Sequence, residues 1–163
     1  VINTAVKGGE APVEVEKAAL DSMTRLNKEA RDAARDLDIH AATDVTGFSL
    51  SGHSLEVAEN SGVTVEIEVE KVPILNGAEE LARFGFIPEG MYNNLDWVQG
   101  KVYYSPSIPL AKRDLMLDPQ TSGGLLFFLP QEDAETLLKR LNKEYVKIIG
   151  RVKKKGQYGV EFI

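Results

Sequence analysis

Two segments more than seventy residues apart each place a carboxylate beside hydroxyls and glycines in otherwise apolar surroundings. They are His40–Phe48, with the sequence HAATDVTGF, and Asp118–Leu126, with the sequence DPQTSGGLL. A carboxylate is a hard oxygen ligand suited to Mg²⁺, which completes its shell with phosphate oxygens and water. Hydroxyls and paired glycines let backbone N–H groups approach an anion closely. The two segments therefore predict a site that meets phosphate or a metal.

Asp44 is the metal-ligand candidate of the first segment. It follows an apolar stretch typical of a buried strand and precedes Gly47. Its carboxylate should therefore lie at a strand end, where ligands of layered α/β folds gather. The alternative is a helix cap, in which Asp44 or Thr46 accepts N–H bonds at the start of the next helix. Spacing alone favours the cap, because Asp before a helix is common.

The anion-binding candidates of the second segment are Thr121, Ser122, Gly123 and Gly124. They do not form a P-loop, because the lysine is missing and a strand follows where a helix N-terminus would be needed. A tight turn after Pro119 explains the same residues equally well. Asp118 could bind a cation or cap that turn.

Other catalytic chemistries find little support in this chain. The absence of cysteine removes a disulfide framework, a thiolate metal site and a cysteine nucleophile. His40 and His53 are thirteen residues apart with a predicted strand end between them, which is no metal-ligand spacing. No serine lies in a nucleophile-elbow context. We therefore assign no catalytic residue within these 163 residues.

The charge balance and the hydropathy limit the kinds of partner that this chain can bind. A formal net charge of −6 argues against a nucleic-acid or acidic-membrane surface, because such partners ask for a basic face. No apolar run is long enough to cross a bilayer, and the first residues lack the layout of a secretion signal. We expect a cytoplasmic protein that binds neither nucleic acid nor membrane.

Hydrophobic periodicity predicts helices and strands in an irregular alternation. The pattern predicts a long helix over 12–37, a strand over 39–42 ending in a turn at 43–47, a helix over 48–60, a strand over 63–69, a short helix over 74–84, an irregular stretch over 86–104, a central strand over 125–129 followed by a helix, and a hairpin of 146–152 with 158–163. This order predicts an α+β fold, a layered domain with a mixed sheet and packed helices. We expect residues 1–163 to form one folding unit.

Several of these motifs, taken in order, closely resemble the C-terminal half of selenophosphate synthetase, also called selenide, water dikinase. The matching segments are Thr43–Phe48 followed by Gly52-His53, Val72–Leu75 with Gly77-Ala78, Gly90 followed by Asn94, Asp118–Leu126, and Ile149–Val152. Together they extend over nearly the entire chain.

The resemblance implies an ATP-dependent kinase-type transferase that makes selenophosphate from selenide, with AMP and phosphate as the other products. It implies a fold like the C-terminal domain of aminoimidazole ribonucleotide synthetase. Asp44 corresponds to the family's Mg²⁺ ligand at the phosphate end of ATP, and Thr121–Gly124 should line the same cleft. Mg²⁺ and ATP are the expected cofactors, with ATP and selenide as substrates. The full-length protein should be a homodimer formed chiefly through its N-terminal domain.

The same resemblance places the catalytic cysteine or selenocysteine, an essential lysine and most ATP contacts in an N-terminal domain that this chain lacks. We therefore expect the C-terminal half of a two-domain synthetase, inactive alone. Ser49 and Ser51 depart from the glycine and leucine of the family sequence TDVTGFGLLGH. Alternatives are a related enzyme of the thiamine-monophosphate kinase, hydrogenase-maturation or purine-synthesis type, and a non-catalytic binding or scaffold module.

Overall fold

A mixed sheet of four strands, in the order β3-β6-β2-β5, carries the main core. The computed structural model describes residues 1–163, and the strands of this sheet are β2 (Val63–Ile67), β3 (Val102–Tyr104), β5 (Gly150–Lys154) and β6 (Val160–Phe162). β2 pairs antiparallel with β5 and parallel with β6, and β6 pairs parallel with β3. The structure confirms the predicted α+β class with a mixed sheet.

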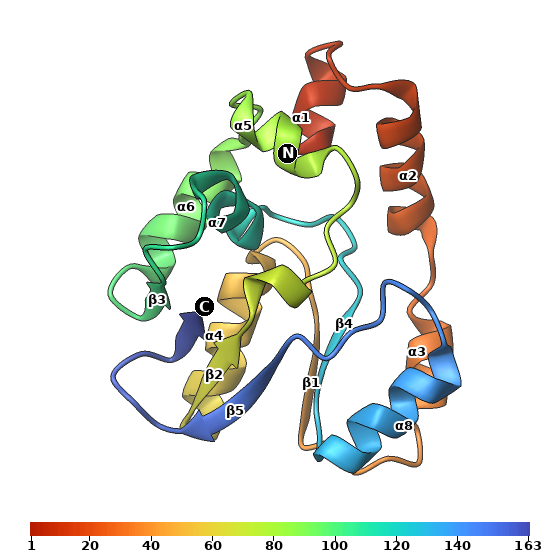
Figure 1. The fold of residues 1–163 in the computed structure, drawn as a ribbon, viewed down its shortest axis with the longest axis vertical. Helices are drawn as coiled ribbons and strands as arrows, with labels where there is room; N and C mark the ends of the chain where they lie inside the picture. Colours follow the sequence, from red (N-terminus) through yellow and green to blue (C-terminus); the bar gives the residue numbers. More distant parts are fainter.

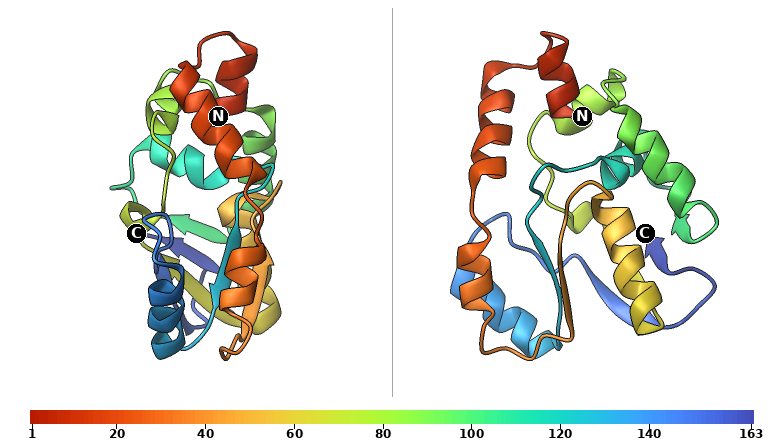
Figure 2. Two further views of the ribbon diagram at one scale, coloured as in Figure 1. Left: turned by 90° about the vertical axis from the view of Figure 1, so that its right-hand side faces the viewer. Right: turned by 180° about the vertical axis from the view of Figure 1, so that it is seen from behind.

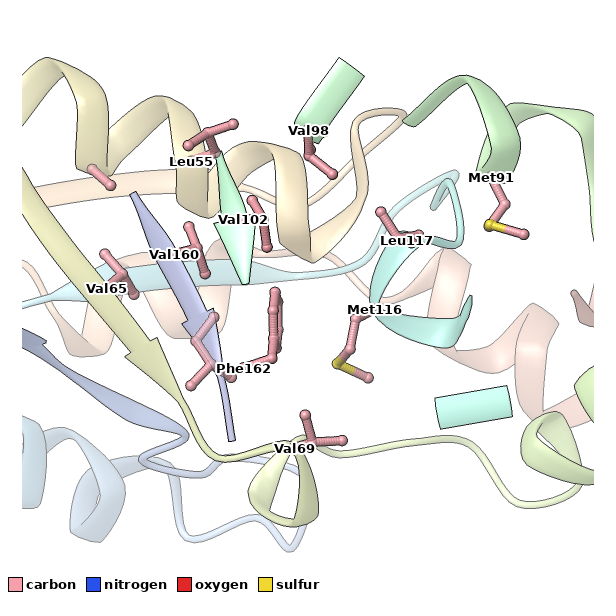
Figure 3. Packing of buried hydrophobic residues seen from close by; sticks show 12 residues of the cluster. Leu55, Val65, Val69, Met91, Val98, Val102, Met116, Leu117, Val160 and Phe162 are labelled. Carbon is pink, nitrogen blue, oxygen red and sulfur yellow. The ribbon is translucent and has the colours of Figure 1, made fainter. Parts of the chain in front are cut away.

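Helix α4 (Ser49–Ser61) packs on this sheet, and α6 (Glu89–Val98) and α7 (Leu110–Leu117) pack on α4 and complete the same core. Figure 3 shows the resulting core, a single apolar cluster that includes Leu55 of α4, Met116 of α7 and Phe162 of β6. Leu55 and Phe162 are fully buried. Burial of apolar surface contributes about 25 cal/mol per Å² to stability, so this layer anchors α4 and the turn that precedes it.

A second, two-stranded antiparallel ribbon is formed by β1 (Ala41–Asp44) and β4 (Leu125–Phe128). The two strands run side by side between the sheet and the pair of helices α3 (Lys28–Ala33) and α8 (Gln131–Leu141) (Figure 1). Ala34, Leu137 and Leu141 form a small buried cluster there. The predicted helix after β4 is confirmed as α8.

The remaining helices pack at the opposite end of the molecule, as both views of Figure 2 show. They are α1 (Ile2–Lys7), α2 (Val13–Thr24) and α5 (Ala78–Arg83), and the 3₁₀ turn η1 (Val69–Lys71) leads toward them from β2. A cluster that includes Ala5, Val15 and Leu81 is buried between them. No helix combines the length and the apolar character needed to span a membrane.

The long helix expected over 12–37 is wrong, because the chain breaks between α2 and α3. Arg25 leaves the helix with an extended backbone, at ψ 125°, and Leu26 is 76% exposed. The apolar stripe is divided: Val15 and Ala19 pack with α1 and α5, whereas the part after the break packs with α8. One continuous apolar periodicity in the sequence thus serves two separate hydrophobic clusters. The break between them depends on contacts with residues distant in sequence, so the local pattern does not show it.

The stretch 86–104 is not irregular, because it contains α6 and β3. Pro88 precedes the helix with an extended backbone, and Met91, Asn94 and Val98 form its buried side. The glycine and asparagines that suggested a loop are tolerated because tertiary packing outweighs weak local propensity. The helices α1 and α7 were not predicted.

The predicted hairpin at the C-terminus is also wrong. β5 and β6 do not pair with each other, because β2 lies between them. β4 is not a central strand either, since it pairs only with β1 and its side chains are half-buried. β1 extends to Asp44, so the predicted turn starts after this residue.

Glu66 on β2 is buried, although it alternates along the strand with the apolar core residues Val65 and Ile67. Its two carboxylate oxygens contact Arg151 Nε at 2.7 Å and Lys153 Nζ at 2.8 Å. The hydrogen bond from Lys153 and then that from Arg151 lower the pKa of Glu66. The ion pairs from β5 therefore stabilise the charged form of this carboxylate in place of the water that would solvate it on an exposed strand.

Candidate phosphate and metal site

The two polar segments singled out in the sequence lie side by side. In the β1–β4 ribbon Asp44 faces Leu125. Beyond the ribbon, Val45 N–H donates to the Gly124 carbonyl at 2.9 Å, and Gly123 N–H donates to the Val45 carbonyl at 2.9 Å. The backbone therefore continues the pairing past Asp44 into the glycine loop.

The paired glycines are required by this close approach. A Cβ atom on Gly123 would lie 2.7 Å from the Val45 carbonyl oxygen, and Gly124 has a φ of +91°. Side chains are strongly disfavoured at both positions. The backbone of the loop is held by its hydrogen bonds to Val45 and not by a hydrogen-bonded turn of its own.

Asp44 does not cap a helix. The N-cap residue of α4 is Phe48, and the helix start has no side-chain cap. Thr46, the other proposed cap, places its hydroxyl against His53 instead. The Asp44 side chain is exposed and takes part in none of the hydrogen bonds or ion pairs of the chain. Its carboxylate is therefore available to a cation.

The side chains of Thr121 and Ser122 are likewise without hydrogen-bond partners, and Thr121 is exposed. The loop Thr121–Gly124 lines a large open hollow of about 1590 Å³, whereas Asp44 lines a smaller one of about 760 Å³. Leu125 and Phe127 belong to the walls of both hollows. The structure thus joins the two segments through their backbones, whereas the segments line two different hollows that share part of their walls.

Two arginines that the sequence analysis did not select line the hollow of Asp44. They are Arg31 and Arg35, on and just after α3, and Arg35 forms no salt bridge. Guanidinium groups bind phosphate through a fork of N–H donors. Their four-residue spacing was visible in the sequence. Their position opposite the strand end was not.

Asp118 is buried and already paired. Gln120 Nε2 donates to its Oδ2 atom at 3.1 Å and to its backbone carbonyl at 3.0 Å. Burial raises the pKa of the Asp118 carboxyl. Asp118 anchors the start of the glycine loop in this chain.

No group of three or more His, Cys, Asp or Glu side chains is arranged to hold a metal ion. Asp44 fits Mg²⁺ as a single oxygen ligand, because magnesium commonly takes one or two protein carboxylates and fills its shell with phosphate and water. His53 lies inside the protein, with 8% of its surface exposed.

Residues 3–163 match the family described as AIR synthase related protein, C-terminal domain. This chain belongs to that family. It is 45% identical over 163 residues to the selenide, water dikinase of Caldanaerobacter subterraneus, a match that covers 98% of this chain and 47% of the relative. The selenide, water dikinase of Clostridium botulinum strain Alaska E43 is 46% identical over 161 residues, covering 96% of this chain and 46% of the relative.

A more distant relative, the selenide, water dikinase 2 of Peptoclostridium acidaminophilum, is 37% identical over 163 residues, covering 98% of this chain and 47% of the relative. The chain therefore spans about half the length of the curated relatives it matches. The expected resemblance is confirmed for the AIR synthase related C-terminal domain.

This AIR synthase related domain carries backbone strain at Ser49, the first residue of α4. Ser49 has a φ of 67°, is fully buried, and its hydroxyl has no hydrogen-bond partner. A left-handed backbone costs a residue with a side chain about 1–2 kcal/mol, and an unsatisfied buried hydroxyl adds about 1–3 kcal/mol. A glycine at this position would offset about 0.5–1 kcal/mol of the stability gained by removing these costs, because glycine has greater conformational freedom in the unfolded chain.

We expect Ser49→Gly to stabilise the protein by about 1–4 kcal/mol, measured by denaturant unfolding of the purified chain. Ser49→Ala removes the hydroxyl but keeps the Cβ atom, so it should recover only part of this gain. A glycine variant no more stable than the parent would show that Ser49 is unstrained.

Proposed function

We propose that this chain is the C-terminal half of an ATP-dependent selenophosphate synthetase, which converts selenide, ATP and water to selenophosphate, AMP and phosphate. In this proposal residues 1–163 form one domain, and an N-terminal domain supplies the catalytic nucleophile and most ATP contacts. The observation that carries the proposal is the backbone pairing of the Asp44 strand end with the Thr121–Gly124 loop. The relatives named selenide, water dikinase support it.

Asp44 is the proposed Mg²⁺ ligand, and Thr121, Ser122, Gly123 and Gly124 form the proposed cleft wall. Bound Mg²⁺ would neutralise charge on the phosphates of ATP. Phosphoryl transfer depends on positioning and electrostatic stabilisation, which the free carboxylate and the partnerless hydroxyls could provide. Arg31 and Arg35 would add positive charge beside the phosphates from the α3 side.

The proposed partners are selenide and ATP as substrates, the N-terminal domain, and a second copy of the full-length protein. We further propose that the enzyme works in the cytoplasm. Because this chain has no cysteine, a cysteine nucleophile would have to come from the other domain.

The test compares the full-length protein with this chain alone. With selenide, ATP and Mg²⁺, the full-length protein should form selenophosphate, followed by ³¹P NMR, and AMP in equal amount. The isolated chain should show no ATP turnover above the protein-free background, since one carboxylate cannot assemble the site. The proposal fails if the full-length protein consumes ATP independently of selenide, or if the isolated chain alone makes selenophosphate.

A further inference from the structure

His53 lies at the centre of a hydrogen-bonded relay beside the proposed site. Its Nδ1 atom is 2.9 Å from Glu56 Oε2, one turn later on α4, and its Nε2 atom is 3.1 Å from Thr46 Oγ1. The imidazole is buried, and the Phe48 ring packs on it with centroids 5.7 Å apart. The side chains of Glu56, His53 and Thr46 thus form one continuous chain of hydrogen bonds.

The proton positions follow from the partners. An ionised carboxylate can only accept hydrogen bonds, so Nδ1 carries a proton and donates to Glu56. In the neutral ring Nε2 is then an acceptor, and the Thr46 hydroxyl donates to it. Glu56 therefore sets the tautomer of His53, and His53 sets the rotamer of Thr46.

Thr46 is the residue where the two polar segments meet. Its carbonyl oxygen accepts the backbone N–H of Gln120 at 3.0 Å, just before the glycine loop. The next carbonyl, that of Gly47, accepts from Asn94 Nδ2 at 2.9 Å, and Asn94 also donates to Leu117 at 3.0 Å. The turn between β1 and α4 is therefore tied to the glycine loop, α6 and α7.

A turn that merely links a strand to a helix does not need a buried imidazole. An apolar side chain of similar shape would fill the space at little cost, whereas a buried polar group is costly unless fully paired. Both ring nitrogens of His53 are paired. Satisfied buried networks of this kind rigidify their surroundings.

We propose that His53 is a positioning residue that acts through Thr46, locking the turn so that Asp44 and the Thr121–Gly124 loop keep one fixed relation to each other. The assignment of a ligand to that pair rests on the proposed function. Removing a residue that orients a ligand-binding group through a hydrogen bond typically lowers activity or metal affinity by 10- to 100-fold.

The test uses Thr46→Val, His53→Asn and His53→Gln in the full-length protein. The glutamine amide reaches about as far as Nε2 and can still accept from Thr46, whereas the asparagine amide reaches only about as far as Nδ1. We expect His53→Asn and Thr46→Val to lower kcat, and to raise the Mg²⁺ concentration for half-maximal rate, by about 10- to 100-fold. His53→Gln should stay within about threefold of the parent while losing similar thermal stability to His53→Asn.

A matched control is Ser54→Ala. Ser54 is on the same helix and fully buried, but its hydroxyl has no partner. This variant should leave both kinetic parameters unchanged. If His53→Asn and His53→Gln lose activity equally, or if neither does, the relay has no positioning role.

A second readout keeps this test independent of the enzymatic assignment. Amide hydrogen exchange at Gln120 and Gly123, which donate to the turn, should be at least about tenfold faster in His53→Asn and Thr46→Val than in His53→Gln or Ser54→Ala. Unchanged exchange overturns the relay even in an active enzyme. A parent protein without selenide-dependent AMP formation, but with this exchange pattern, overturns only the proposed function.

Discussion

Replacing Asp44 by asparagine in the full-length protein should lower the rate of selenide-dependent AMP formation by at least about a hundredfold at limiting Mg²⁺. The asparagine keeps the shape of the side chain and removes its charge. A neutral amide is a much weaker magnesium ligand than a carboxylate, and the developing phosphate charge would be less neutralised. The measurement is AMP release across a Mg²⁺ titration, with high Mg²⁺ restoring part of the rate.

The fold should not respond to this change. Asp44 is exposed and has no side-chain partner to lose, so the melting temperature should stay within about 2 °C. Asp38→Asn is a matched control, because Asp38 precedes β1 and contacts only the exposed His40 through its side chain. This control should retain the parent rate. A fully active Asp44→Asn protein throughout the titration would remove Asp44 from the proposed site.

Gly150→Ala should destabilise the chain by about 3 kcal/mol or more, or prevent folding, because β5 passes too close to β2 for any side chain. A Cβ atom on Gly150 would lie 2.0 Å from the Glu66 carbonyl oxygen, and Gly150 pairs with Ile67. The backbone of β5 would have to move away and lose ladder hydrogen bonds. Denaturant unfolding of the purified chain measures the loss as a lower midpoint.

Gly156→Ala serves as the comparison for this prediction. A Cβ atom there meets its nearest neighbour, Thr64 Oγ1, at 3.5 Å, an ordinary van der Waals distance. Its effect should remain within about 0.5 kcal/mol. Equal effects of the two alanine substitutions would contradict the β2–β5 pairing described above.

Local sequence patterns predicted the elements whose boundaries depend on neighbouring residues. The helix expected over 48–60 is α4, and it stops at Gly62, which has the left-handed φ of 65° that a helix end favours. The helix after β4 and the α+β class were predicted for the same reason. The break at Arg25 and the insertion of β2 between β5 and β6 were not, because each depends on partners far away in the sequence.

The residue types of the two polar segments were enough to select Asp44 and Thr121–Gly124 as candidates and to suggest phosphate and Mg²⁺ as their ligands. Residue types could not separate a helix cap from a free carboxylate, or an anion loop from a tight turn. The first question is decided by the structure, in which Phe48 is the N-cap of α4 and Asp44 has no side-chain partner. The loop itself is held by hydrogen bonds across more than seventy residues, such as Gly123 to Val45. A one-dimensional pattern records which groups a segment carries, whereas pairing and burial determine which of them are already satisfied and which remain open to a ligand.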